Sequence, residues 1–362
     1  MRPACSTSLL RGISLLMNSF ITLPKLTRGD QVAVISPSAG LPGLFPWVQE
    51  LGLQRLRDVF GLVPLEYPTT RHLQAPLEAR AQDIMRAFAN PANKAVFSSI
   101  GGSDQLRLLK YLDPAVLVAN PKLFFGFSDS THLHLFLWNL GIPSYYGAAV
   151  MTQLAMQQRM HPYTVQSLAN ALFTTGEVEV VASAYYTDEA LEWADPANLN
   201  RERAVASNEG WHWDGTADGT GRLWGGCVES LVAQVAAEKY LPSAAALQGS
   251  VLYLETSETM PPAWVLDYLL TGFGERGWLH LFQAVLVGRP KAWDFAQPLT
   301  PSQKAAYCAQ QRATVVEAVR AYNPLIPIVQ NMDFGHTDPQ LVLPGGQLAR
   351  VMGSERRIFL TY

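Results

Sequence analysis

Short apolar runs alternate with helical patterns along the first half of the chain. Val32–Ile35 is apolar throughout, and the stretches 95–100 and 122–127 repeat this pattern. Between them, residues 46–60 and 75–89 place apolar side chains at the three- and four-residue spacing of amphipathic helices. Strands that are apolar on both faces and alternate with helices are typical of a parallel sheet covered on both sides. The pattern therefore predicts an α/β layer. A further strand at 62–67 and helices at 106–112 and 130–140 complete it.

The pattern changes after about residue 165. Residues 184–222 are polar and loop-like, with several Asp, Asn, Gly and Trp residues, and we place the domain junction here. Two domains also suit a chain of 362 residues, at roughly 150 residues per domain. The predicted bounds are 23–175 for the N-terminal domain, 176–210 for a linker and 211–362 for a smaller C-terminal α/β domain. In the latter we expect strands at 250–255, 282–287, 327–330 and 347–352, and helices at 263–270 and 301–322.

Residues 1–22 are expected to form an N-terminal extension outside the two domains. Arg11 interrupts the apolar residues, and the run Gly12–Met17 is shorter than the roughly 7–15 residues that a secretory signal needs. A translation start at Met17 explains the extension better. No stretch reaches the roughly 18–20 uncharged apolar residues of a spanning helix, so no membrane segment is expected.

Composition narrows the classes of function. Hydrophobic residues make up 48% and charged residues 16% of the chain, which predicts a folded protein rather than a disordered one. Lys and Arg number 27 against 30 Asp and Glu, with no basic run, so nucleic-acid binding is not expected. Three cysteines without a CxxC motif indicate neither a disulfide framework nor a zinc site and favour a reducing compartment, the cytoplasm.

Ser128 is the sharpest local candidate for chemistry. It lies in Gly126-Phe127-Ser128-Asp129, between a predicted buried strand and a predicted helix. A serine on such a turn can expose its hydroxyl above the sheet edge, as in the nucleophile elbow, although the second glycine of G-x-S-x-G is missing. The competing interpretation is that Ser128 only caps the following helix.

A serine nucleophile needs a base and an acid that orients the base. His336 lies in a loop rich in Gly, Asp and Pro between two apolar runs, which makes it the best candidate among seven histidines. Glu255 ends the apolar run 251–255, where a charge needs solvent or a partner. An ordinary surface-loop histidine and a strand-end glutamate remain the alternatives.

A pair of glycines adds a possible anion site. Gly101 and Gly102 end a predicted strand, and their backbone N–H groups could form half of an oxyanion hole, with the N–H of Asp129 as the other half. The same loop could hold a phosphate, which leaves a phosphate-sugar or nucleotide enzyme as a rival class. Neither GxGxxG nor GxxxxGK[ST] occurs, so a nucleotide-binding loop of those kinds is not indicated.

Taken together, these segments resemble the LD-carboxypeptidase (S66) family of serine peptidases, which includes muramoyltetrapeptide carboxypeptidases and microcin C self-immunity proteins. The resemblance runs along nearly the whole chain from about Leu23. No single motif decides it, but eight occur in order at matching spacing. They are residues 29–38, 80–84, 99–104, 120–129 (from Asn-Pro-Lys to Gly-Phe-Ser-Asp), Gly147, 225–227, 254–258 and 334–337.

The resemblance implies a Ser–Glu–His triad divided between two domains. Carried over by position, Ser128 is the nucleophile, His336 the base and Glu255 the acid that holds it, while Gly102 and Asp129 donate the oxyanion-hole N–H groups. It also implies a flavodoxin- or amidotransferase-like N-terminal domain and a swivelling, barrel-like C-terminal domain. A homodimer without metal or cofactor is implied as well.

Two motifs favour the microcin-immunity-like branch of the family, namely Ile-Gly-Gly-Ser-Asp at 100–104 and Leu-Glu-Thr-Ser-Glu at 254–258. In that branch an aromatic residue between the domains stacks on a nucleotide base, a role that Trp211 or Trp213 could take if they do not simply pack the junction. We expect Gly101 and Ser103 to contact substrate too. The expected substrate is a murein peptide or an aminoacyl or peptidyl nucleotide. A non-catalytic protein that sequesters a peptidyl nucleotide is the alternative.

Overall fold

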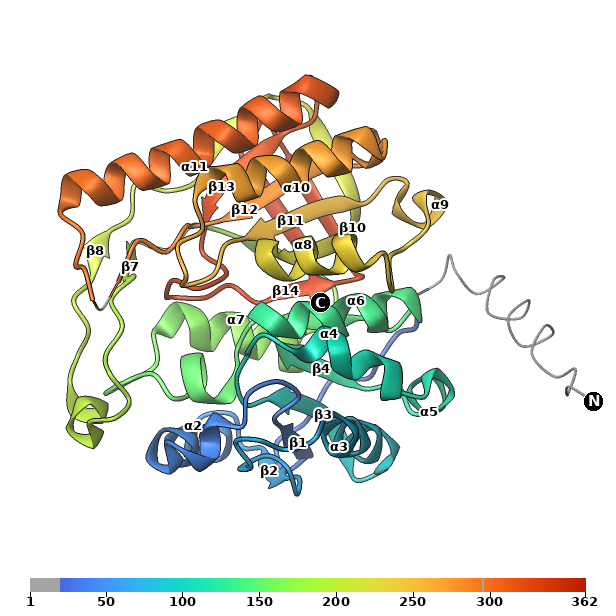
Figure 1. The fold of residues 1–362 in the computed structure, drawn as a ribbon, viewed down its shortest axis with the longest axis vertical. Coiled ribbons are helices and arrows are strands. Elements are labelled where there is room, and N and C mark those ends of the chain that lie inside the picture. The colour runs from blue at the N-terminus through green and yellow to red at the C-terminus, as the bar shows by residue number, and fades with distance from the viewer. Residues whose placement is uncertain (1–19, 295) are drawn as a thin grey trace, which may run out of the picture.

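The computed structural model describes residues 20–294 and 296–362. Two halves are stacked on one another, each built around its own sheet (Figure 1). The predicted fold class is confirmed: an α/β protein with a parallel N-terminal sheet and a second α/β half. Most of the predicted extension 1–22, including the proposed start at Met17, lies outside the described residues.

The first sheet has six strands in the order β14-β5-β4-β3-β1-β2. Five of them come from the N-terminal half and run parallel. The sixth, β14, comes from near the C-terminus and pairs antiparallel with β5. The strands are β1 (Gln31–Ile35), β2 (Val63–Glu66), β3 (Asn93–Ser98), β4 (Leu123–Gly126), β5 (Ser144–Tyr146) and β14 (Leu343–Gly345).

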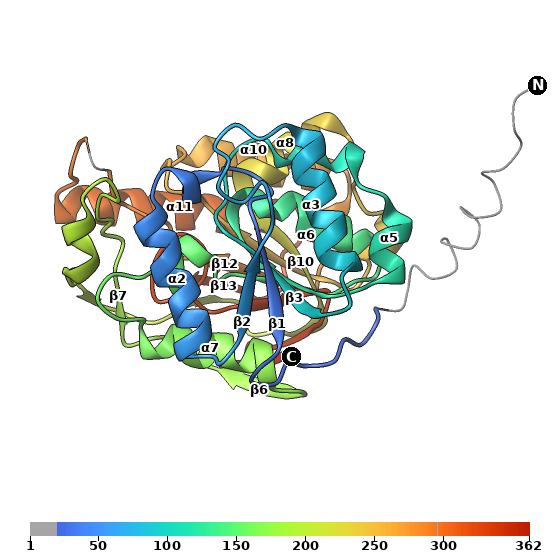
Figure 2. The same cartoon turned by 90° about the horizontal axis from the view of Figure 1, so that it is seen from below.

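Helices cover both faces of this sheet. Val32 and Val34 of β1 point into a core shared with α2 (Pro46–Asp58) and α7 (Pro162–Phe173). Ala33 and Ile35 point the opposite way. Figure 2 shows α2 and α3 on opposite sides of β1 and β2. The helices on the second face are α3 (Leu77–Ala89), α4 (Gln105–Leu108), α5 (Pro114–Ala119) and α6 (Thr131–Asn139), with the short turns η2 (Leu109–Tyr111) and η3 (Ser128–Ser130) nearby. The short turns η1 (Leu41–Gly43) and η4 (Val150–Leu154) pack beside α2.

The second sheet has eight strands in the order β6-β16-β15-β10-β11-β12-β13-β9. Its centre, β10 to β13, is parallel, and the strands outside it are antiparallel. The strands are β6 (Glu177–Val180), β9 (His212–Asp214), β10 (Asp218–Cys227), β11 (Val251–Glu255), β12 (Ala284–Gly288), β13 (Ile328–Met332), β15 (Leu348–Met352) and β16 (Arg357–Thr361).

One face of the second sheet packs under helices and the other packs against the first half. Leu252 and Leu254 of β11 point into a core that includes the helices. Val251 and Tyr253 of the same strand join the core that also holds Val32 and Phe125. The two halves therefore share one continuous apolar core. The helices here are α8 (Val228–Ala237), α9 (Ala244–Leu247), α10 (Ala263–Glu275) and α11 (Pro301–Tyr322), with the short turn η6 (Trp278–His280).

The region predicted as a linker contributes some regular structure. Its first residues form β6, which pairs with β16 at the edge of the second sheet. The short strands β7 (Tyr185–Tyr186) and β8 (Ala206–Ser207) pair with one another, and the turn η5 (Pro196–Asn200) lies between them. The exact domain bounds stay a prediction. In residues 20–294 and 296–362, no helix combines the length and apolar character needed to cross a bilayer.

Candidate active site

The turn after β4 exposes Ser128 in a strained conformation. Ser128 has a φ of 62°, in the left-handed region that non-glycine residues seldom adopt outside special turns. It is half-buried, and its backbone N–H donates a hydrogen bond to the Tyr146 hydroxyl at 3.1 Å. Strain of this kind is stored where a side chain must be presented to a site. The geometry is therefore that of a nucleophile elbow.

The glycine loop after β3 lies directly against this turn. A Cβ on Gly101 would lie 3.1 Å from Ser128 Oγ and 3.5 Å from the Asp129 backbone N, so only glycine fits here without a shift. The Asp129 carboxylate reaches the same loop, because its Oδ2 accepts hydrogen bonds from the backbone N–H groups of Asp104 (3.1 Å) and Gln105 (3.0 Å). This side chain joins the serine turn to the glycine loop.

Glu255 and His336 meet at the carboxyl ends of β11 and β13. Nδ1 of His336 lies 2.6 Å from Glu255 Oε2, and both side chains are buried, with exposed fractions of 8% and 0%. Gly335 makes this contact feasible, since its φ is +95° and a Cβ there would lie 2.6 Å from Glu255 Oε2. Burial alone would lower the pKa of His336, but the charge and hydrogen bonds of Glu255 and Glu258 outweigh it and raise that pKa to about 10.

Glu258 occupies the other ring nitrogen of His336. Its Oε2 lies 3.0 Å from His336 Nε2, and its side chain is 60% exposed. The hydrogen bond to His336 lowers the pKa of Glu258 to about 2, against the opposing effect of burial. Among the described residues, Ser128 Oγ has no hydrogen bond to His336. His336 is thus held as a cation between two carboxylates, with Ser128 on the same cavity wall.

Tyr146 links the two halves of the site, and nothing in the sequence pattern pointed to it. Its hydroxyl accepts from the Ser128 N–H and donates to Glu255 Oε1 at 2.6 Å. Burial, followed by the charge of Glu255, raises the pKa of Tyr146 well above its usual value, so the hydroxyl keeps its proton. The serine turn of the first half and the acid of the second are therefore joined by one side chain.

A cavity of about 660 Å³ opens beside these residues. Ser128, His336 and Glu258 line it together with the predicted Gly101 and Gly102. An apolar wall completes it and includes Leu41, Phe45, Met151 and Trp193. Trp193 packs edge-on against Phe45, with 5.7 Å between the ring centroids.

The other residues predicted to contact substrate lie elsewhere. Ser103 is exposed and is not among the described residues that line the cavity. Trp211 donates its indole N–H to Asp333 Oδ2 at 2.9 Å, and Trp213 packs on the shared core. Trp211 and Trp213 are thus not among the described residues that line the cavity, and the tryptophan that does line it is Trp193, beside Phe45 and Phe127. A position in the junction alone could not separate these three tryptophans.

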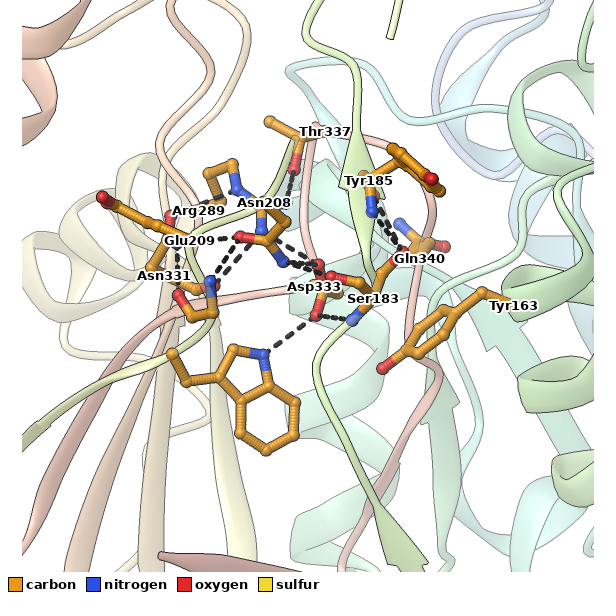
Figure 3. A network of polar contacts seen from close by, with 12 residues as sticks. Tyr163, Ser183, Tyr185, Asn208, Glu209, Arg289, Asn331, Asp333, Thr337 and Gln340 are labelled. Atoms are coloured by element: carbon orange, nitrogen blue, oxygen red, sulfur yellow. Dashed lines mark hydrogen bonds and ion pairs between the residues drawn. The ribbon is translucent and has the colours of Figure 1, made fainter. Parts of the chain in front are cut away.

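A buried polar network supports the loop that carries His336 (Figure 3). Arg289 and Asp333 form an ion pair at 2.9 Å with exposed fractions of 3% and 0%. Asp333 also accepts hydrogen bonds from the Ser183 backbone N–H at 3.0 Å and the Asn208 amide at 3.3 Å. The predicted linker is in this way tied to a residue three positions before His336.

The match to known families follows the two halves. The family models "LD-carboxypeptidase N-terminal domain" and "LD-carboxypeptidase C-terminal domain" match residues 32–147 and 220–351. The chain therefore belongs to the LD-carboxypeptidase, or S66 peptidase, family, as its motifs predicted.

Individual relatives resemble the chain over most of its length. A putative carboxypeptidase of Treponema pallidum is 27% identical, with 90% of each chain covered. The microcin C7 self-immunity protein MccF of Escherichia coli is 23% identical over 93% of this chain and 94% of its own. Among solved structures, an MccF-like protein from Streptococcus pneumoniae in complex with AMP superposes with a TM-score of 0.80 at 27% identity, covering 92% of this chain and 99% of that one.

Proposed function

We propose that this protein is a serine carboxypeptidase or amidase that uses Ser128, His336 and Glu255 as its triad. The observation that carries the proposal is the buried contact of 2.6 Å between His336 and Glu255 on a cavity that Ser128 also lines. A carboxylate on Nδ1 fixes the imidazole tautomer and stabilises the imidazolium that forms during the reaction. A serine and a histidine on one cavity, with a buried carboxylate behind the histidine, suit acyl transfer better than phosphate binding.

In the proposed reaction, the cationic His336 first loses its Nε2 proton to solvent and with it the contact with Glu258. The neutral Nε2 then takes the proton of Ser128 Oγ. The oxygen attacks the amide carbonyl, and the backbone N–H groups of Gly102 and Asp129 stabilise the resulting oxyanion. His336 then gives the proton to the leaving amine, and the C–N bond breaks to leave an acyl-enzyme. In the second half of the reaction, His336 takes a proton from a water molecule, whose oxygen attacks the ester carbonyl. The bond to Ser128 Oγ then breaks, and His336 returns the proton to that oxygen.

For the substrate we propose a small peptide or an aminoacyl or peptidyl nucleotide, as for the microcin-immunity-like branch. The S. pneumoniae relative was solved with AMP, and the present cavity has an aromatic wall at Phe45 and Trp193. Stacking of a base on an aromatic ring contributes about 1–3 kcal/mol in nucleic-acid systems. Trp193 is therefore the residue on which we expect a base to stack, in place of Trp211 or Trp213.

The test uses the purified protein and its Ser128→Ala variant. Both are incubated with a murein tetrapeptide that ends in D-Ala and with a microcin-like aminoacyl nucleotide, and the products are identified by mass spectrometry. Release of D-Ala supports a role in murein recycling, and release of modified AMP supports detoxification. Cleavage of either substrate should fall by several orders of magnitude in Ser128→Ala. Undiminished cleavage by that variant would refute the mechanism.

One alternative keeps the fold without the reaction. Because Glu258 and not Ser128 contacts His336 Nε2, the protein could bind a peptidyl nucleotide without cleaving it. Labelling of Ser128 by a fluorophosphonate separates the two, since only an activated serine reacts. The cytoplasmic location remains a prediction, and so does the homodimer, which the family resemblance implies. Light scattering on the purified chain would measure the oligomeric state.

A further inference from the structure

Lys291 is a cation in the active-site cavity without a partner of its own. It follows β12 and lines the cavity together with Ser128, His336 and Glu258. Its side chain is half-buried, and no hydrogen bond or ion pair joins it to another residue in the described part of the chain. A long ammonium side chain removed from much of its water normally acquires a counter-charge.

The acids around Lys291 are all engaged elsewhere. The charged groups that act on it are Asp338, Glu258, Arg203 and Asp188. Arg203 and Asp338 form an ion pair at 2.8 Å, and each is only 12% exposed. Glu258 contacts the cationic His336 at 3.0 Å.

Asp188, the remaining acid, forms an ion pair with Lys304 at 2.8 Å. Each neighbouring acid therefore has a direct contact with a cation other than Lys291, although Glu258 shares His336 with Glu255. The further cavity carboxylate, Glu192, is exposed to solvent. Lys291 is therefore left without a direct hydrogen-bond acceptor or ion-pair partner in a partly enclosed space that also holds Ser128.

We propose that Lys291 binds an anionic group of the substrate, a carboxylate or a phosphate, and so makes a negative charge a requirement for recognition. The inference rests on the proposed function, because it assigns Lys291 to the substrate of the same site. A bound anion would supply the direct, charged hydrogen-bond acceptor that the protein itself does not provide for Lys291. The two sources of such a group are the free C-terminal carboxylate of a peptide and the phosphate of a nucleotide.

The experiment measures binding by calorimetry with two matched pairs of probes. AMP is compared with adenosine for the phosphate, and N-acetyl-L-alanyl-D-alanine with its C-terminal amide for the carboxylate. We expect the anionic member of at least one pair to bind the wild type about ten- to a hundredfold more tightly, the range for a charge-assisted hydrogen bond. In Lys291→Gln this preference should disappear. Lys239→Gln, which removes an exposed lysine on the surface, is the matched control and should retain it.

Two results would overturn the proposal. One is a wild type that binds neither anion more tightly than its neutral counterpart. The other is a folded Lys291→Gln variant, judged by its thermal melt, that keeps the full preference. Labelling of wild-type Ser128 by a fluorophosphonate is measured in parallel. A failure of labelling contradicts the triad, whereas the anion preference depends only on binding, so the two proposals fail separately.

Discussion

We expect Glu258→Gln to make His336 a better base near neutral pH. In the wild type, His336 is held as a cation by Glu255 on Nδ1 and by Glu258 on Nε2, and its pKa is raised to about 10. A general base must be neutral to accept a proton, so the reaction of Ser128 should rise as the pH approaches that pKa. Removing the Glu258 charge lowers the pKa, which increases the neutral fraction at any pH below it.

The size of the shift follows from the geometry. Glu258 Oε2 and His336 Nε2 lie 3.0 Å apart, with side-chain exposures of 60% and 8%, so the value for water is the lower limit of their attraction. Unit charges at this distance attract by about 1.4 kcal/mol in water, which corresponds to about one pKa unit. The rising limb of the pH profile should therefore move down by at least about one unit, and the rate below the limb should increase at least about tenfold.

The assay is the second-order rate constant for labelling of Ser128 by a fluorophosphonate, measured from pH 6 to pH 10 or slightly above. This reagent needs an activated serine but no knowledge of the natural substrate. Glu192→Gln is the matched control, because Glu192 is another carboxylate on the cavity and has no contact with His336 among the described residues. The rising limb of the pH profile of its labelling rate should not move. A limb that does not move in Glu258→Gln, or that moves upward, would contradict the assigned role of Glu258.

Three further changes test the support of the site. Burial lowers the pKa of His134 from 6.5 to about 4. The free energy of unfolding should therefore fall by roughly 2–3 kcal/mol as the pH falls from 6.5 towards 4, because the unfolded state binds a proton that the folded state does not. In His134→Asn, urea unfolding at pH 7 and at pH 4.5 should not show this loss. Asp333→Asn removes the carboxylate that pairs with the buried Arg289 and should lower the free energy of unfolding by about 3–5 kcal/mol. A loss below 1 kcal/mol would refute the view that this ion pair stabilises the fold. Gly101→Ala places a Cβ 3.1 Å from the nucleophilic oxygen and should slow fluorophosphonate labelling about ten- to a hundredfold, whereas Gly272→Ala, in open space on a helix, should not.

Local patterns predicted some of the long elements but not all, since α7, α8 and β10, with ten to twelve residues each, were missed. The helix expected at 301–322 is α11 (Pro301–Tyr322), because Thr300 and Gln303 form a capping box and Pro301 occupies the first turn. The apolar run Val32–Ile35 forms most of β1 because both faces of its sheet are covered. Short strands were missed. β5 and β14 have three residues each, and β14 finds its partner almost two hundred residues earlier in the chain, which no local pattern encodes.

The same distinction applies to the candidate site. Ser128 and Glu255 each lie at the end of an apolar strand, and His336 lies in a loop rich in Gly, Asp and Pro. Such local patterns can be recognised in a single sequence. Tyr146 and Glu258 act through contacts that only the folded chain makes: one between β5 and β11, the other between the loop after β11 and the loop after β13. Trp193 packs on Phe45, far earlier in the sequence, whereas Trp211 donates its indole N–H to Asp333, and no local pattern encodes either contact.

Tyr146 explains why the site should depend on both halves of the protein. The Ser128 turn is strained, with φ of 62°, and its backbone N–H is satisfied by the Tyr146 hydroxyl. That hydroxyl can accept from Ser128 in a fixed orientation because its own proton is committed to Glu255 Oε1. Glu255 in turn uses its second oxygen for His336. The Ser128 turn, Tyr146, Glu255 and His336 thus form one chain of hydrogen bonds that crosses between the two sheets. The antiparallel pairing of β14 with β5 adds a backbone link beside it, at Leu343 opposite Tyr146. A displacement of one half against the other would break the orientation of His336 and release the strain at Ser128 together. The geometry of the proposed nucleophile and that of its proposed base are therefore set by the same contact.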